Sequence, residues 1–386
     1  MSDIKIPILD LKPQYQSIKA EIKAAIDKVL ESGQFVLGPT VSQFEADAAQ
    51  YLGVKYAIGV NSGTDALMIA LRALGVGPGD EVITTPFSFF ATAESISCVG
   101  AKPVFVDIDK ASFNIDPSLI EKAITPKTKA IMPVHLYGNP AAIAQITKIA
   151  QAHNLKIVED CAQSFGAVYK GDCIGCDQAC DDDIRQSLMG QKTGALGDIG
   201  AFSFFPTKNL GAYGDAGLIT TDDDELAELA SMLRVHGAKQ RYKNEMLGYN
   251  SRLDAMQAAV LGVKLNYIDT WNQQRREVAK TYSRLLEGVD EVMTPAIAAG
   301  HVFHQYTIRI LNGQRDAVKQ AMAEAGVGAM IYYPIPQDRL PVYDGQYPAN
   351  DVSNALGKEV LSLPIWPELS AEKQKVVVDA LKAGLS

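Results

Sequence analysis

The stretch "DEVITTPFSFFATAESISCVGAKPVFVDI", residues 80–108, decides how this chain folds. Its two ends, "DEVITT" and "KPVFVDI", are short apolar runs rich in β-branched and aromatic residues, as expected of buried strands. The segment between them is long enough for a helical crossover, which parallel strands require. The stretch therefore predicts two parallel strands of one sheet, joined by a helix.

The same alternation extends outward in both directions. The β-rich runs "KAIMPV" (129–134) and "LKIVED" (155–160) follow it, while apolar residues recur at helical spacing over 18–32 and 63–74. Strands that alternate with helices are typical of a mostly parallel sheet with helices on both faces. We therefore expect an α/β fold.

The pattern changes in the last third of the chain. A long amphipathic helical region (250–288) is followed by "FHQYTIRI", a helix near 314–325, "AMIYYPIP" and a final helix near 370–384. This order indicates a smaller α+β domain. We divide the chain into a large domain at 1–265, which begins with a helical arm, and a small C-terminal domain at 266–386.

Composition excludes several classes of protein. The 386 residues are 47% hydrophobic and carry a net charge of −9, which argues against a nucleic-acid-binding protein. No apolar run approaches the roughly 20 residues that a membrane helix needs, and the first residues do not resemble a secretory signal. The five cysteines, an odd number, fit a reducing compartment, so we expect a cytoplasmic protein.

In such sheets ligands bind at the carboxyl ends of the strands, so the residues there are candidates. "GVNSGTDAL" (59–67) passes from strand to helix through Ser62, Gly63 and Thr64, which suit either a phosphate or a ligand-free helix cap. "TTPFSFFATAES" (84–95) places Phe89 at a similar junction, where the ring either faces a ligand or packs in the core.

Two further segments carry charged residues at strand ends. "KIVEDCAQSFGA" (156–167) ends a strand in Glu159 and Asp160, which point in opposite directions because side chains alternate along a strand. One of these carboxylates can pair with a cationic ring nitrogen, or cap a helix. "FSFFPTKNLGAYGDAG" (202–217) holds Lys208 five residues after Ser203 and before three glycines, which favour a close backbone approach or an unusual turn.

Together these parts match one cofactor, pyridoxal 5′-phosphate. A phosphate cradle, an aromatic plate, a buried acid and a lysine are what this group requires of a protein. The lysine forms a Schiff base with the aldehyde, and the acid keeps the pyridine nitrogen protonated so that the ring can accept electrons.

The chain resembles a known family at these positions. "SGTDAL", "PFSFFATAES", "VEDCAQSFGA", "FSFFPTKNLGAYGDAG" and "GYNSRLDAMQAA" occur in the order seen in the pyridoxal-phosphate-dependent nucleotide-sugar aminotransferases of the DegT/StrS type. The resemblance covers nearly the whole chain. It implies the aspartate-aminotransferase-like fold (fold type I), a homodimer with shared active sites, and transfer of an amino group, usually from glutamate, to a ketone on a nucleotide-linked sugar.

The resemblance also implies roles for individual residues. Lys208 corresponds to the Schiff-base lysine and Asp160 to the partner of the pyridine nitrogen. The other cofactor-binding positions are Gly63, Thr64 and Ser203 at the phosphate, Phe89 on the ring, Gln163 at the phenolic oxygen, and Asn250 reaching the phosphate from the other subunit. For the substrate we expect Arg241, Lys243, His304 and Tyr333. The basic pair suits a diphosphate or a sugar carboxylate, but surface charges or a structural histidine would look the same.

Two segments bear on the position of the new amine. "SGTDAL", with aspartate after the threonine, and "RVHGAKQRYKNEMLGYNSRLD" (234–254) resemble family members that aminate carbon 3 more than those that act on carbon 4. We therefore expect a nucleotide-linked 3-keto hexose, for which a 2-acetamido group or a carboxylate at carbon 6 are options.

Other interpretations remain open at this point. A related class that dehydrates sugars has histidine in the place of Lys208, and a non-catalytic sensor with the same fold would not need an intact lysine and acid. A dinucleotide-dependent dehydrogenase would need a G-x-G-x-x-G motif at its first helix. Cys173, Cys176 and Cys180 lie in an extension rich in aspartate, which without an evident fourth ligand indicates a loop rather than a metal site.

Overall fold

Seven strands form the central sheet: β1 (Tyr56–Val60), β2 (Glu81–Thr84), β3 (Lys102–Phe105), β4 (Thr128–Met132), β5 (Lys156–Asp160), β6 (Ile199–Ser203) and β7 (Gly217–Thr221). The computed structural model of the protein describes residues 5–171 and 181–385. The strand order is β1-β7-β6-β5-β4-β2-β3; β7 is antiparallel to both of its neighbours, and all other adjacent pairs are parallel. The predicted α/β fold with a mostly parallel sheet is confirmed.

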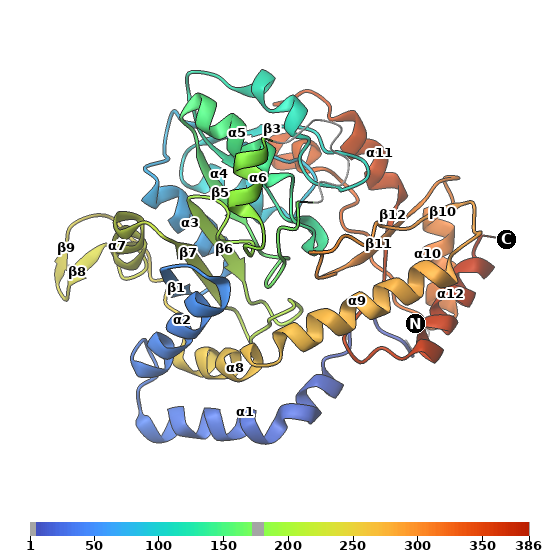
Figure 1. The fold of residues 1–386 in the computed structure, drawn as a ribbon, viewed down its shortest axis with the longest axis horizontal. Coiled ribbons are helices and arrows are strands. Elements are labelled where there is room, and N and C mark those ends of the chain that lie inside the picture. Colours follow the sequence, from blue (N-terminus) through green and yellow to red (C-terminus); the bar gives the residue numbers. More distant parts are fainter. Residues whose placement is uncertain (1–4, 172–180, 386) are drawn as a thin grey trace.

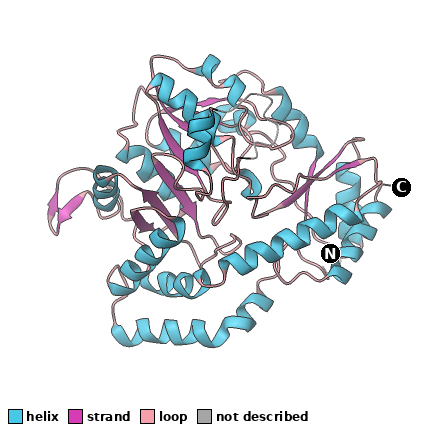
Figure 2. Ribbon diagram, in the orientation of Figure 1, coloured by secondary structure: helices cyan, strands magenta, loops and turns pink. Residues whose placement is uncertain are grey.

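Helices cover both faces of this sheet (Figure 2). Val82 and Val158 pack in one hydrophobic cluster with α3, α4 and α7, whereas their chain neighbours Ile83 and Ile157 pack on the opposite face with α5 and α6. This alternation is the period of two that a strand buried on both faces requires. The helices of this part are α2 (Pro39–Leu52), α3 (Gly63–Ala73), α4 (Ala91–Cys98), α5 (Ile143–His153), α6 (Asp182–Leu188), α7 (Asp224–Leu233) and α8 (Ala255–Leu265).

A second, three-stranded sheet lies in the last third of the chain. It has the antiparallel order β10-β11-β12. Its elements are α9 (Ile268–Leu285), β10 (Val292–Met293), β11 (Tyr306–Ile310), α10 (Arg315–Glu324), α11 (Asp351–Glu359), β12 (Val360–Leu363) and α12 (Ala371–Ala383). The stretch 329–336 contributes only an isolated bridge, Met330 to Ser362, so the third strand comes from a segment that the sequence pattern did not single out.

The amino-terminal segment joins this second sheet. Ile6 belongs to the hydrophobic cluster of β11 and α12, and residues 5 and 6 hydrogen-bond to Gly326. The chain then enters α1 (Lys12–Ser32), which packs on α8. Helix α9 runs from the larger sheet toward the smaller one (Figure 1). The division at residue 265 stays a prediction.

Two peripheral features complete the fold. The hairpin β8 (Ala238–Gln240) and β9 (Lys243–Asn244) projects from the body beyond α7 (Figure 1). Short 3₁₀ helices are η1 (Pro117–Leu119), η2 (Glu121–Ala123), η3 (Leu136–Gly138), η4 (Gln337–Arg339) and η5 (Pro341–Tyr343). Among the described residues, no helix combines the length and the apolar character needed to cross a membrane.

Candidate functional site

A cavity of about 430 Å³ lies at the carboxyl ends of β4, β5 and β6. Its wall includes Val134 just after β4, Asp160 at the end of β5 and Ser203 at the end of β6. This is the position at which open α/β sheets bind ligands. Of the residues expected at the site, the cavity is lined by Gly63, Thr64, Phe89, Asp160, Gln163, Ser203, Lys208, His304 and Tyr333.

Lys208 reaches the cavity from the turn between β6 and β7. The turn is fixed by backbone hydrogen bonds from Phe204 to Ala216 (2.8 Å) and from Lys208 to Phe205 (2.9 Å). Burial lowers the pKa of Lys208 to about 8, and the negative charge of Asp160 opposes that shift. An amine with this pKa is partly neutral near physiological pH, which a nucleophile and proton carrier needs.

Asp160 faces the same cavity from the end of β5 and is 4% exposed. Its Oδ2 accepts a hydrogen bond from the Thr92 hydroxyl (2.8 Å), and its Oδ1 accepts one from the Ala162 N–H (3.1 Å). Burial raises its pKa, while these two bonds and the charge of Lys208 lower it. Burial thus disfavours the charged forms of Asp160 and Lys208, whereas the attraction between their opposite charges favours both charged forms. A cationic ligand placed between them would stabilise the carboxylate of Asp160 further.

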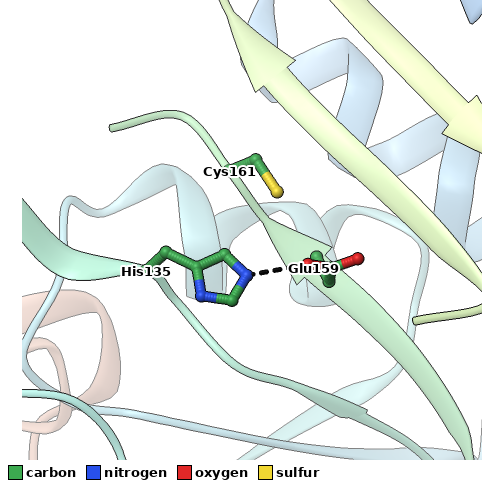
Figure 3. A group of neighbouring side chains, drawn as sticks. All are labelled: His135, Glu159 and Cys161. Carbon is green, nitrogen blue, oxygen red and sulfur yellow. Dashed lines mark hydrogen bonds and ion pairs between the residues drawn. The ribbon is translucent and has the colours of Figure 1, made fainter. Parts of the chain in front are cut away.

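Glu159, unlike Asp160, does not line the cavity, as strand alternation predicts, and Figure 3 shows it beside His135 and Cys161. Its carboxylate accepts hydrogen bonds from the backbone N–H groups of Gly194, Leu196 and Gly197 at 2.8–2.9 Å, and it pairs with His135 Nε2 at 2.9 Å. The other imidazole nitrogen, Nδ1, accepts from the Ala141 N–H (3.0 Å).

His135, Glu159 and Cys161 are all buried within metal-binding distance of one another, but the hydrogen bonds of Glu159 and His135 already use the lone pairs that a metal ion would need. We read the group as a polar clamp between the strand ends and the 194–197 loop. His135 belongs to this clamp and does not line the cavity.

The wall near α3 is too closely packed for larger residues. Ser62 caps α3 by accepting from the Asp65 N–H (3.1 Å), and Gly63 and Thr64 occupy the first turn beside the cavity. A Cβ on Gly63 would lie 2.5 Å from the Ser203 Cβ, and a Cβ on Gly217 would lie 2.3 Å from the backbone carbonyl oxygen of Ser62. The glycines therefore serve close backbone approach, and the N-terminus of α3 offers N–H groups to an anion.

Aromatic side chains form the rim of the cavity. Phe89 is 59% exposed, and its ring centroid lies 6.5 Å from that of Tyr333. Gln163 donates through Nε2 to the Tyr333 hydroxyl (3.1 Å) and accepts from the Tyr137 N–H (2.8 Å). An apolar ring left open at the rim of a polar cavity is available to stack on a planar ligand.

His304 is neutral, and its tautomer follows from its neighbours. Asn209 donates through Nδ2 to Asn272 Oδ1 (2.8 Å) and Val302 O (3.1 Å), so its Oδ1 faces the imidazole. His304 Nδ1 must donate to that oxygen (3.2 Å), so Nε2 is the acceptor and receives a long hydrogen bond from Gln305 Nε2 (3.4 Å). Burial and the charges of Lys208 and Arg275 lower the pKa of His304 well below its usual value. The cavity thus contains a neutral proton acceptor near Lys208.

Three expected site residues lie elsewhere in this chain. Asn250, Arg241 and Lys243 are exposed and do not line the cavity. Lys243 begins β9 in the projecting hairpin, and the Arg241 guanidinium lies 5.1 Å from the centre of the Tyr242 ring. Their predicted roles stay predictions, and any contact with a site would have to come from a second subunit.

Other cavity residues were not expected from the sequence. Thr92, the hydroxyl partner of Asp160, lies three residues after Phe89, and that spacing could have identified it. Thr207 and Asp215, both within the stretch 202–217, also line the cavity, as do Tyr332 and Gln305, but the sequence analysis assigned none of the four a role. Cys173, Cys176 and Cys180 lie outside the described residues.

Comparisons with known proteins agree with this geometry. The model of the DegT/DnrJ/EryC1/StrS aminotransferase family matches residues 16–382. The chain is 50% identical to the "Pleiotropic regulatory protein" of Geobacillus stearothermophilus, with 98% of both chains covered. It is 45% identical to the UDP-N-acetyl-3-dehydro-α-D-glucosamine 3-aminotransferase of Acidithiobacillus ferrooxidans, with 95% of both covered. The crystal structure of DesV from S. venezuelae "in complex with ketimine intermediate" superposes with a TM-score of 0.90 at 41% identity, with 98% of both covered.

Proposed function

The chain belongs to the DegT/DnrJ/EryC1/StrS aminotransferase family, and from this premise we propose that it moves an amino group from glutamate to carbon 3 of a nucleotide-linked keto sugar. The observation that carries the proposal is that Lys208 and Asp160 face one cavity whose other wall is the N-terminus of α3. We further propose that the reaction takes place in the cytoplasm.

The residues of the cavity fit pyridoxal 5′-phosphate. Lys208 would hold the aldehyde carbon, Asp160 the ring nitrogen, and Gly63, Thr64 and Ser203 the phosphate. The lack of space for a Cβ at Gly63 supports this assignment, because a phosphate at a helix N-terminus needs the backbone to come close. When bound, this group supplies an electron sink for the carbon that loses its proton.

The chain's own side chains would then transfer protons and stabilise charge. Lys208 Nζ, with a pKa of about 8, can take a proton from one atom and return it to another near neutral pH. Asp160, with Thr92 and Ala162 fixing its orientation, holds a positive charge on the ring nitrogen. His304 Nε2 accepts a long hydrogen bond from Gln305 (3.4 Å), which a substrate hydroxyl can replace, and Tyr333 and Gln163, hydrogen-bonded to each other, also line the cavity.

We propose a homodimer, in which Asn250, Arg241 and Lys243 act on the partner's cavity. Apolar side chains exposed near the cavity mouth support this, including Phe205 at 49% and Phe89. An open groove of about 660 Å³, lined by residues of α1 and by Tyr213, adds apolar surface. Surfaces of this kind mark protein interfaces more often than free solvent-facing surface.

The dimer can be tested by mixing two impaired variants. Asn250→Asp should weaken turnover strongly, because it puts a carboxylate next to the expected phosphate. Mixed in equal amounts with Lys208→Ala under conditions that allow subunit exchange, it should regain about one quarter of the wild-type activity, since half the dimers would carry one intact site. Specific activity after mixing is the measurement. No recovery despite subunit exchange, shown with differently tagged subunits, would place Asn250 outside the partner's site.

The choice of carbon 3 rests on the sequence resemblance and on the printed activity of the relative from A. ferrooxidans. With glutamate and matched 3-keto and 4-keto nucleotide sugars, the enzyme should aminate the 3-keto sugar faster by about 100-fold or more, since a misplaced ketone lies out of reach of Lys208. NMR of the product locates the new amine. Amination only at carbon 4 would contradict the regiochemistry and leave the aminotransferase assignment intact.

A sensor is the second candidate, because the relative from G. stearothermophilus carries the name of a regulatory protein. A sensor needs to bind a sugar but does not need a lysine with a lowered pKa opposite a buried acid. The presence of Lys208 and Asp160 in one cavity therefore favours the enzyme. Binding of the nucleotide sugar without turnover in the presence of glutamate would favour the sensor.

A further inference from the structure

A buried arginine lines a side chamber of the active-site cavity. The chamber has a volume of about 40 Å³, more than twice the roughly 10–15 Å³ that one water molecule needs. It shares four wall residues with the main cavity, namely Thr207, His304, Gln305 and Tyr332. Arg275, from the first half of α9, lines the chamber but not the main cavity.

The guanidinium of Arg275 has few partners for a buried charge. The residue is 3% exposed, and its hydrogen bonds within the described chain all start from Nη1 and run to the backbone carbonyls of Phe303 (3.3 Å), His304 (3.5 Å) and Ile365 (3.3 Å). The described arginines that form ion pairs are Arg234, Arg309, Arg315 and Arg339. Arg275 is thus without an ion-paired carboxylate in this part of the chain.

The charge persists at neutral pH. Burial lowers the pKa of Arg275 to about 10, and the negative charge of Glu368 limits that shift. A buried cation is costly unless it is paired, and a guanidinium presents its N–H groups in a fork that matches a carboxylate. Within the described residues, the hydrogen bonds of the guanidinium all start from Nη1, so Nε and Nη2 remain for a ligand.

We propose that Arg275 is the receptor for a carboxylate of the amino donor, which enters the side chamber while the donor's amine lies in the main cavity beside Lys208. The proposal rests on the function proposed above and names the donor subsite within it. Thr207, adjacent to Lys208 in the chain, lines both spaces, so a small amino acid can span them.

The test compares Arg275→Met and Arg275→Lys with Arg276→Met in the cofactor-loaded enzyme. Arg276 is the matched control because it too bonds backbone carbonyls, those of Ala298 (2.8 Å) and His301 (2.7 Å), yet it lines neither space. Glutarate, which has two carboxylates and no amine, serves as an unreactive probe of binding by calorimetry. The donor half-reaction with glutamate and the acceptor half-reaction with the keto sugar are followed separately by the absorbance of the cofactor.

Arg275→Met should weaken glutarate binding and lower kcat/KM for glutamate, each by about 10- to 100-fold. This is the loss expected when a pair of charge-assisted hydrogen bonds is removed. Arg275→Lys, which keeps the charge and is the variant more certain to fold, should lose less because it lacks the fork. The acceptor half-reaction of both variants and all properties of Arg276→Met should stay within about threefold of wild type.

Unchanged glutarate affinity in the Arg275 variants, or an equal loss in both half-reactions, would overturn the donor subsite while the aminotransferase assignment stands. Failure of the wild-type enzyme to react with any amino donor would instead overturn the proposed function and the subsite with it. The two failures are therefore distinguishable in the same set of measurements.

Discussion

Lys208→Ala is expected to abolish transamination, with a loss of at least about 10⁴-fold, because one side chain supplies both the covalent hold on the cofactor and the proton transfer. The cavity offers no described substitute, because burial and neighbouring charges lower the pKa of His304 and so make it a weak base, and an imidazole cannot form the Schiff base. Steady-state rates with glutamate and a 3-keto nucleotide sugar measure the loss.

Borohydride reduction followed by peptide mapping gives the matching chemical test. The label should appear on the peptide that contains Lys208 and disappear in Lys208→Ala. Lys264 is an internal control, because burial lowers its pKa to about 7 although it lies away from the cavity, donating to the Gly211 carbonyl (2.6 Å). A label on Lys264, or substantial turnover by Lys208→Ala, would contradict the assignment.

Asp160→Asn is expected to lower the rate by about 10³-fold or more, because a neutral amide no longer stabilises a positive charge on the ring nitrogen of the cofactor. Asparagine has the same shape, so its oxygen can still accept from Thr92 or Ala162 and the fold should be preserved. The measurement is kcat together with the absorbance spectrum of the bound cofactor as a function of pH.

Thr92→Val is the graded control for this variant. It removes one hydrogen bond to the carboxylate but keeps the charge, so it should lower the rate by about 10-fold, far less than Asp160→Asn. Rates for Asp160→Asn within about tenfold of wild type, with the cofactor fully bound, would show that this carboxylate does not govern the charge of the ring.

Local sequence patterns predicted much of this molecule. Short apolar runs identified β2, β3, β4 and β5, and helical spacing identified most of α1 and α3, because each pattern depends on neighbours along the chain; the connection from β3 to β4 contains only the 3₁₀ helices η1 and η2. The opposite orientations of Glu159 and Asp160 followed from strand alternation alone. The long region 250–288 instead forms two helices, α8 and α9, and β12 was not recognised.

The strand-end motifs, together with the family resemblance, also brought Lys208, Asp160, Gly63, Thr64, Ser203, Gln163 and Phe89 to one site, and the cavity contains all of them. Asn250, Arg241 and Lys243 are not among the residues that line this chain's own cavity. A role for these residues needs a second subunit, which a single sequence cannot position.

Tertiary structure alone decided the protonation and the hydrogen-bond partners of the side chains around the site. The neutral tautomer of His304 depends on Asn209, which lies 95 residues away in the chain. Asn209 is oriented by its hydrogen bond to Asn272, which lies 63 residues from Asn209. Among the described residues, Arg275 bonds the backbone carbonyls of Phe303, His304 and Ile365, which the fold brings around it, and forms no ion pair. Such properties arise from burial and from contacts between distant segments, which set hydrogen-bond partners and pKa values. The sequence by itself determined which groups stand at the strand ends, and the packing of the two sheets determined their protonation and what each can bind.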